Sequence, residues 1–136
     1  MELVVVLALI GILSGAAIVN LKVTRQPLAE ASVEIQHFLK LVRARAMSQT
    51  LAMKVEPSSS TRISVSSGNS CSGTMTSVQG FFLDLPLGAS LPSTTCSICF
   101  TPRGFAEASS SFVVSETSTS HQKTILVSLA GGTKEQ

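Results

Sequence analysis

The feature that most constrains this 136-residue chain is an uncharged apolar run near its start. Residues 3–19 are seventeen residues interrupted only by Gly11, Ser14 and Gly15. As a helix the run would be about 26 Å long, at the short end of what crosses a bilayer. A surface helix of a soluble protein keeps a polar face, and this run has none. The sequence therefore predicts a helix that a membrane or other apolar helices enclose.

A buried core helix and a cleaved secretory signal are the alternatives for this run. The rest of the chain is too small to surround a core helix of that length. Gly15-Ala16-Ala17 imitates a signal cleavage site, but a signal begins with positive charge and this chain offers Glu2. We therefore expect residues 1–27 to form a transmembrane or filament-core helix.

A second helical pattern, amphipathic this time, follows Asn20. Its acids come first and its bases last, as the helix dipole prefers. Pro27 lies between the two segments and predicts a kink or a new helix start. The pattern predicts an amphipathic helix over residues 28–50. Its apolar stripe consists of Leu28, Ala31, Ile35, Phe38, Leu39, Val42 and Ala46.

From residue 51 the pattern changes to short alternating segments separated by Gly, Pro and Ser. Six strands are expected, at residues 51–56, 61–66, 81–87, 97–101, 111–116 and 123–129. A sheet with one face on the helical stripe would bury both surfaces. The fold class is therefore α+β, with a long N-terminal helix, apolar in its first half and kinked near Pro27, packed on an antiparallel β domain. We call residues 28–136, the amphipathic helix plus the β region 51–136, the head.

Charge and motifs exclude several function classes. The net charge of +2 does not fit a strongly basic nucleic-acid protein. His37, His121 and Asp84 accompany no nucleophile motif, so no catalytic residue and no cofactor is predicted. A zinc site needs about four ligands, and the chain has two histidines and three cysteines, so no metal site is predicted.

The three cysteines are Cys71, Cys96 and Cys99. Cys96 and Cys99 form a C-x-x-C, but they lie on a predicted strand, whereas a redox pair usually opens a helix. A structural disulfide in an oxidising compartment is the better interpretation. It would join Cys71 to either Cys96 or Cys99.

The N-terminal pattern, from Glu2 through the apolar residues to Leu13, resembles the start of a mature type IV pilin-like protein. The resemblance implies that a basic leader ending in Gly, followed by a Phe-Thr-Leu-type tripeptide, precedes Met1, and that processing and N-terminal methylation act there. It implies that Glu2 pairs with the N-terminal amine of a neighbouring subunit, because a buried carboxylate needs a cation. Gly11 and Gly15, four residues apart, would permit close contact between helices.

Two C-terminal segments narrow the resemblance to the GspH/FimT group of minor pilins and type II secretion pseudopilins. They are Ile98–Gly104, which ends in Pro-Arg-Gly, and Thr124–Gly132, which ends in Gly-Gly. The resemblance implies a single-pass bacterial inner-membrane protein with a periplasmic C-terminal domain. Its partners would be other pilin or pseudopilin subunits and the inner-membrane assembly platform, and it would prime or cap the filament.

Two alternative functions remain open at this stage. One is a DNA-binding minor pilin for natural transformation, and the other is an anchored β-domain adhesin that never assembles. DNA contact would need a cationic patch, and the chain has no Tyr or Trp for base stacking. The candidate DNA-contact residues are Arg43, Arg45, Lys54, Arg62, Arg103, Lys123 and Lys134.

Overall fold

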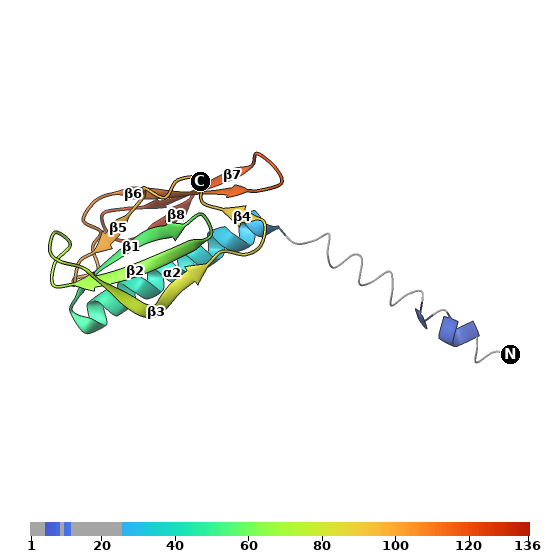
Figure 1. Ribbon diagram of the computed structural model, residues 1–136, viewed down its shortest axis with the longest axis horizontal. Coiled ribbons are helices and arrows are strands. Elements are labelled where there is room, and N and C mark those ends of the chain that lie inside the picture. The colour runs from blue at the N-terminus through green and yellow to red at the C-terminus, as the bar shows by residue number, and fades with distance from the viewer. Residues whose placement is uncertain (1–4, 9, 12–25) are drawn as a thin grey trace.

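The structure is a computed structural model, and it describes residues 5–8, 10–11 and 26–136. Residues 5–8 and 10–11 are helical, and residues 28–136 form the head (Figure 1). No helix within the described residues has the length and apolar character needed to cross a membrane. The kink expected before Pro27 lies outside the described residues.

Helix α2 spans Pro27–Gln49 and confirms the amphipathic helix expected over 28–50. Pro27 occupies the first turn, where its missing N–H costs no hydrogen bond. The helix ends at Gln49, and its C-cap residue Thr50 adopts the left-handed conformation with φ 54°. The Leu51 N–H then donates to Ala46 O at 3.2 Å, which satisfies one of the last carbonyls of the helix.

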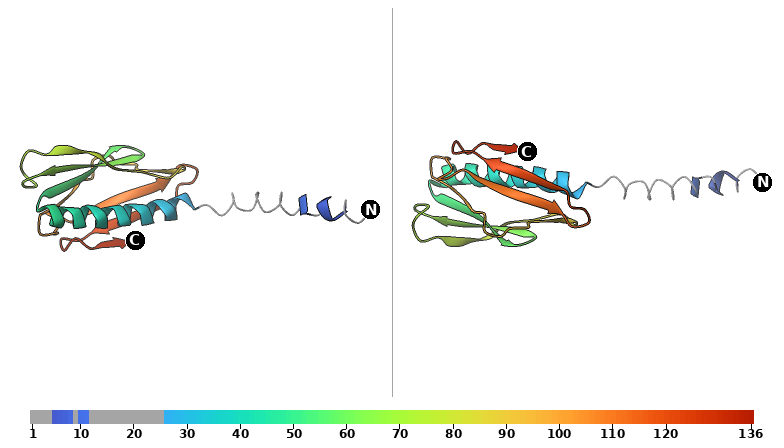
Figure 2. Two further views of the ribbon diagram at one scale, coloured as in Figure 1. Left: turned by 90° about the horizontal axis from the view of Figure 1, so that it is seen from below. Right: turned by 90° about the horizontal axis from the view of Figure 1, so that it is seen from above.

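The β region forms two antiparallel sheets. The first has the order β3-β2-β1-β5 and consists of β1 (Ala52–Ser59), β2 (Arg62–Gly68), β3 (Thr76–Asp84) and β5 (Ile98–Phe100). The second has the order β4-β6-β7-β8 and consists of β4 (Ala89–Ser90), β6 (Ser110–Glu116), β7 (Gln122–Val127) and β8 (Thr133–Glu135). Helix α2 lies alongside both sheets (Figure 2).

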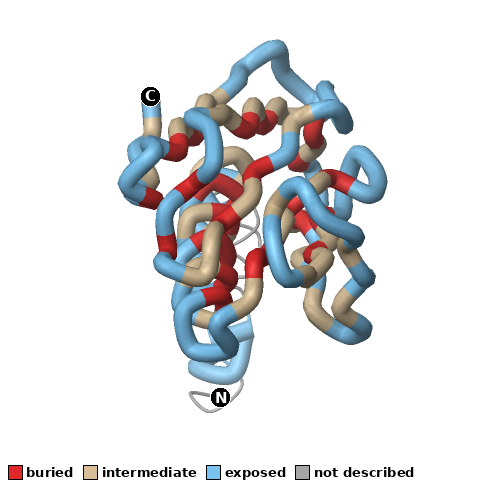
Figure 3. The backbone as a smooth tube through the Cα atoms, turned by 90° about the vertical axis from the view of Figure 1, so that its left-hand side faces the viewer, coloured by how far each residue is buried: buried red, intermediate tan, exposed pale blue. Residues whose placement is uncertain are grey.

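The core lies between α2 and the inner faces of the two sheets, and buried residues recur along both the helix and the strands (Figure 3). Ile63 and Val65 on β2 point inward and are fully buried, as the alternation of that strand predicts. The helical stripe and the strands bury each other, so each supplies apolar surface that the other needs for its core. The largest fully buried side chains are Phe100, Phe112, Ile35, Leu39, Met53, Ile63, Ile98 and Ile125.

Three expectations about the strands were wrong in detail. The described residues form eight strands in two sheets rather than six in one, because β4 and β8 are too short to show an alternating pattern. β1 continues past Pro57, since β5 flanks β1 only over Met53–Val55 and the missing N–H of Pro57 is not needed on that side.

β3 begins at Thr76, although Gly80 suggested a boundary before Phe81. Ser64 pairs with Phe82 and Ser66 pairs with Ser77, so β3 carries extra residues that bulge between these pairs. Gly80 lies in that bulge with φ +72°, a conformation that glycine adopts without steric cost.

Candidate functional site

The predicted assembly residues of the N-terminal segment fall largely outside the described residues. Glu2 and Gly15 are among the undescribed positions, and their predicted roles stay predictions. Gly11 is described, and a Cβ placed on it would meet nothing within 4 Å. Open space at this position is compatible with close approach by another helix.

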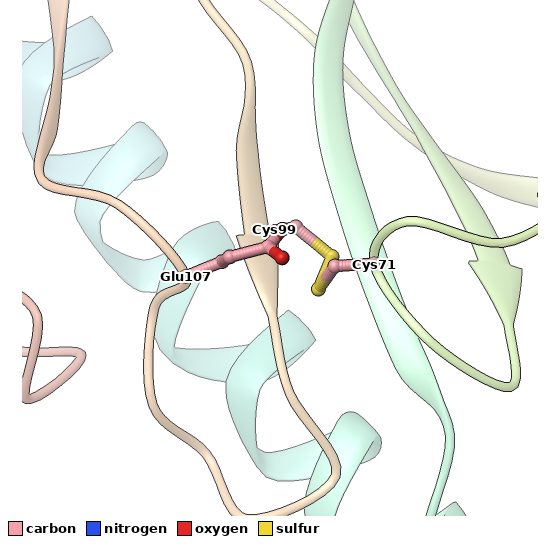
Figure 4. Close-up of side chains that lie close together, drawn as sticks. All are labelled: Cys71, Cys99 and Glu107. Carbon is pink, nitrogen blue, oxygen red and sulfur yellow. A yellow bond between two sulfur atoms is a disulfide. The ribbon is translucent and has the colours of Figure 1, made fainter.

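Cys71 and Cys99 form a disulfide, with an S–S distance of 1.99 Å and a Cα–Cα distance of 5.9 Å. It joins the loop between β2 and β3 to β5 (Figure 4). Cys96 is a free thiol that packs partly against the core, and burial raises its pKa. The structure thus selects Cys99 from the two partners that the sequence left open for Cys71.

One carboxylate, Glu107, lies beside this disulfide (Figure 4). The ligand atoms of Cys71, Cys99 and Glu107 are all within 4.8 Å of one another. A disulfide has no thiolate to offer a metal ion, because each sulfur is bonded to the other. The proximity of these three residues therefore reflects the disulfide and does not indicate a metal site.

Three of the candidate DNA-contact cations are paired with carboxylates. Arg62 contacts both Asp84 oxygens, at 2.5 and 2.9 Å, and its guanidinium lies 4.4 Å from the Phe82 ring centroid. The hydrogen bond from Arg62 lowers the pKa of Asp84. The other two pairs are Lys54–Glu56 at 2.8 Å and Lys123–Glu135.

Two further candidates bind within the head. Arg43 Nη1 donates to Gly131 O at 3.2 Å, and Arg45 lies 4.5 Å from the Phe81 ring centroid. Arg103 and Lys134 are exposed and have no ion pair within the described part of the chain. Most of these cations thus serve intramolecular contacts.

The two sequence motifs that end in glycine turns meet around Arg43. Gly104 and Gly131 have φ of +80° and +77°. A Cβ at Gly104 would lie 2.6 Å from Met47 Sδ, and one at Gly131 would lie 2.5 Å from Gly104 O. Glycine is therefore required at both positions for two reasons, the backbone conformation and the close approach of the two turns.

A candidate functional surface that sequence reasoning missed is a largely apolar groove beside the outer face of α2. Val33, His37 and Leu41, spaced four residues apart, line it together with Glu34, Phe38 and Leu83, and its volume is about 320 Å³. The side chains of Val33 and Leu41 are 50% and 55% exposed. His37 is exposed, and the other side chains that line the groove are apolar except for Glu34. The four-residue spacing of Val33, His37 and Leu41 places them on one helical face, and this spacing could have revealed the helical side of the groove from the sequence.

Glu135 on β8 connects the C-terminal strand to α2. Its carboxylate lies 3.0 Å from Ser32 Oγ and 3.4 Å from Gln36 Nε2, and it also contacts Lys123. These hydrogen bonds, the one from Lys123 first, lower the pKa of Glu135. Ser32 is the only buried polar residue of the described part, and the bond to Glu135 helps satisfy it.

No family model and no curated protein matches the chain. Solved structures do match it. The type IV minor pilin FimU of Pseudomonas aeruginosa has a TM-score of 0.62 and 19% identity, over 80% of this chain and 87% of FimU. Escherichia coli GspH has a TM-score of 0.64 and 13% identity, over 81% and 87%.

A third match is the minor pseudopilin EpsH from the type 2 secretion system of Vibrio cholerae. Its TM-score is 0.61 and its identity 10%, over 82% of this chain and 97% of EpsH. All three share one long helix packed against antiparallel sheets with this chain. The chain therefore has the fold of GspH/FimT-type minor pilins and pseudopilins, and the α+β fold class predicted from the sequence is confirmed.

Proposed function

We propose that this chain is a structural subunit, a minor pilin or pseudopilin, of a type IV pilus or a type II secretion pseudopilus. Residues 1–27 anchor it in the bacterial inner membrane before assembly, and residues 28–136 form the head outside that membrane. Other subunits of the filament then replace the lipid around the apolar helix, and the subunit primes or caps the filament. The fold shared with FimU, GspH and EpsH supports this proposal.

The observation that carries the proposal is the uncovered apolar face of α2. Val33 and Leu41 are about half exposed although the opposite face of the same helix is fully buried. The uncharged run at residues 3–19 lies on the N-terminal side of this helix in the sequence. A helix that offers apolar side chains to the outside is suited to packing against the helices of neighbouring subunits.

The test places one acid in the groove of the full chain. Val33→Asp and Leu41→Asp should each reduce the amount of the subunit in sheared filaments at least about fivefold, because a carboxylate at a packed contact loses its water. The head should still fold, since exposed positions tolerate substitution within about 0.5 kcal/mol. Ser120→Asp, at an exposed loop position, is the matched control and should assemble normally.

Glu2→Ala provides an independent arm of the same experiment. The variant should still insert into the membrane, because the apolar run is unchanged, but it should fail to enter filaments, because its pairing with the neighbouring amine is lost. Normal recovery of Glu2→Ala and of both groove variants in filaments would contradict the proposal.

A further inference from the structure

Glu107 places a carboxylate beside the Cys71–Cys99 disulfide. A carboxylate oxygen of Glu107 and the two sulfurs all lie within 4.8 Å of one another (Figure 4). The Glu107 N–H donates to Cys99 O at 2.9 Å, and Phe100 and Ala106 form a bridge between the same two segments. The backbone of Glu107 is therefore fixed to the strand that carries Cys99.

No cation neutralises this carboxylate within the described residues, because Glu107 forms no salt bridge there. One cation, Lys54, stands opposite Cys99 in the register of β1 and β5. Lys54 is itself bonded to Glu56 at 2.8 Å, and this pair carries no net charge. Glu107 thus leaves a negative charge beside the sulfurs.

A negative charge at this place opposes the reaction that breaks disulfides. In that reaction a thiolate attacks one sulfur of the disulfide, and the other sulfur leaves as a thiolate. The attacking group and the leaving group are therefore both anionic. Two like charges a few Å apart repel each other even in water, so the carboxylate raises the energy of the transition state.

The chain carries an attacking group of its own, the free thiol Cys96, three residues before Cys99. An attack by Cys96 on Cys71 would form Cys71–Cys96 and release Cys99 as a thiolate. An attack on Cys99 would form Cys96–Cys99 and release Cys71. In either case the proton that Cys96 loses passes through water to the released sulfur, and no oxidant or reductant is consumed.

Two features of the fold restrain Cys96. Ile98 and Phe100 are buried, whereas Cys99 between them faces the other side of β5. Cys96 packs against the core, with its Sγ 3.6 Å from Ser93 O, and burial raises the pKa of its thiol. Less of the reactive thiolate is then available. These features do not act on a thiol that arrives from solvent, whereas the charge of Glu107 acts on both.

We propose that Glu107 protects the Cys71–Cys99 disulfide from attack by thiols, including the thiol of Cys96. Its carboxylate slows the exchange by repelling the incoming and the departing thiolate. This role does not depend on whether the subunit enters a filament, so it is tested on the folded full chain in detergent.

The first experiment measures how fast 2-mercaptoethanol, an uncharged thiol, reduces the disulfide at low salt. Two molecules of this thiol supply the electrons and leave as their own disulfide, and the new cysteine thiols are counted by alkylation and mass spectrometry. Glu107→Gln should react at least about threefold faster than the wild type, and Glu107→Lys faster still, because the repulsion is removed and then reversed. Glu30→Gln removes an exposed carboxylate from the first turn of α2, outside the cluster, and should leave the rate unchanged.

Salt distinguishes an effect of charge from a change of shape. In about 1 M salt, where the screening length is near 3 Å, the advantage of Glu107→Gln should fall below about 1.5-fold. Its urea midpoint should equal that of the wild type, because Glu107 is exposed. An acceleration that persists in high salt, or that accompanies a lower midpoint, would come from a loosened fold and would overturn the proposal.

The second experiment follows the internal attack without added thiol. The free thiol is alkylated after incubation at mildly alkaline pH, and the labelled cysteine is identified by fragmentation mass spectrometry. The label should stay on Cys96 in the wild type and should move to Cys71 or Cys99 at least about threefold faster in Glu107→Gln. Adding Cys96→Ser should abolish this movement but keep the faster reduction by 2-mercaptoethanol. Equal reduction rates at low salt, or a label that leaves Cys96 no faster in Glu107→Gln than in the wild type, would overturn the proposal.

Discussion

Removing the Cys71–Cys99 disulfide should destabilise the head substantially. The two residues are 28 positions apart in the sequence. Closing a loop of that length removes about 12 cal/mol/K of chain entropy from the unfolded state, or about 3.5 kcal/mol at 25 °C. Small domains are stable by only about 5–15 kcal/mol, so the cross-link supplies a large share of the total.

The assay is urea unfolding of the full chain in detergent, followed by far-UV circular dichroism. Fluorescence is unsuitable because the chain contains no Trp and no Tyr. For a urea dependence near 2 kcal/mol/M, the double variant Cys71→Ser, Cys99→Ser should unfold at a midpoint lower by about 2 M. A reductant should shift the wild type to the same midpoint and leave the double variant where it is.

Cys96→Ser is the matched control. Its thiol packs partly against the core but closes no loop, so the replacement should cost about 1 kcal/mol or less. Alkylation without reductant should add one label to the unfolded wild type, and alkylation after reduction should add three. If Cys96→Ser lowered the midpoint as far as the double variant does, the pairing described here would be wrong.

Two further predictions concern contacts that hold the turns and the C-terminal strand. The pKa of Glu135 is lower in the folded head than in the unfolded chain. The ionised carboxylate should therefore stabilise the head above about pH 4.3, the ordinary pKa of a glutamate, and this stabilisation should be lost as the pH falls through the lower pKa of the folded state. Glu135→Gln should therefore reduce the free energy of unfolding by about 1 kcal/mol or less at pH 7 and by nothing in strong acid, and an equal loss at both pH values would contradict this reasoning. Gly131→Ala should cost more than Gly80→Ala, at least about 2 kcal/mol against about 1, because both positions have positive φ but only the Cβ at Gly131 would collide with another turn. Equal melting temperatures for these two variants would show that the approach of the two turns imposes no constraint.

The helix of the head could be predicted because its pattern of apolar residues is local in the sequence. The stripe from Ala31 to Ala46 repeats at helical spacing, and Pro27 marks where the helix begins. The alternation of Ile63 and Val65 identified their strand and their buried face in the same way. β4 and β8 carried no such signal, since two or three residues cannot display a period.

The groove beside α2 as a whole could not be predicted from a local sequence pattern. Leu41 and Leu83 line one groove, and Gly104 lies against Met47, although the members of each pair are distant in the sequence. The exposure of an apolar residue depends on how α2 and the two sheets pack, because this packing determines which apolar side chains are covered.

The sequence by itself determined that this chain has an apolar N-terminal run, an amphipathic helix and a β region with a disulfide, because hydrophobic spacing and composition are properties of neighbouring residues. Only the tertiary structure decided that Cys99 rather than Cys96 pairs with Cys71, that the sheet is divided in two, and that Arg43 lies where two glycine turns meet. These features join residues separated by 28 to 88 positions. Strand pairing and packing set such distances, and no local pattern records them.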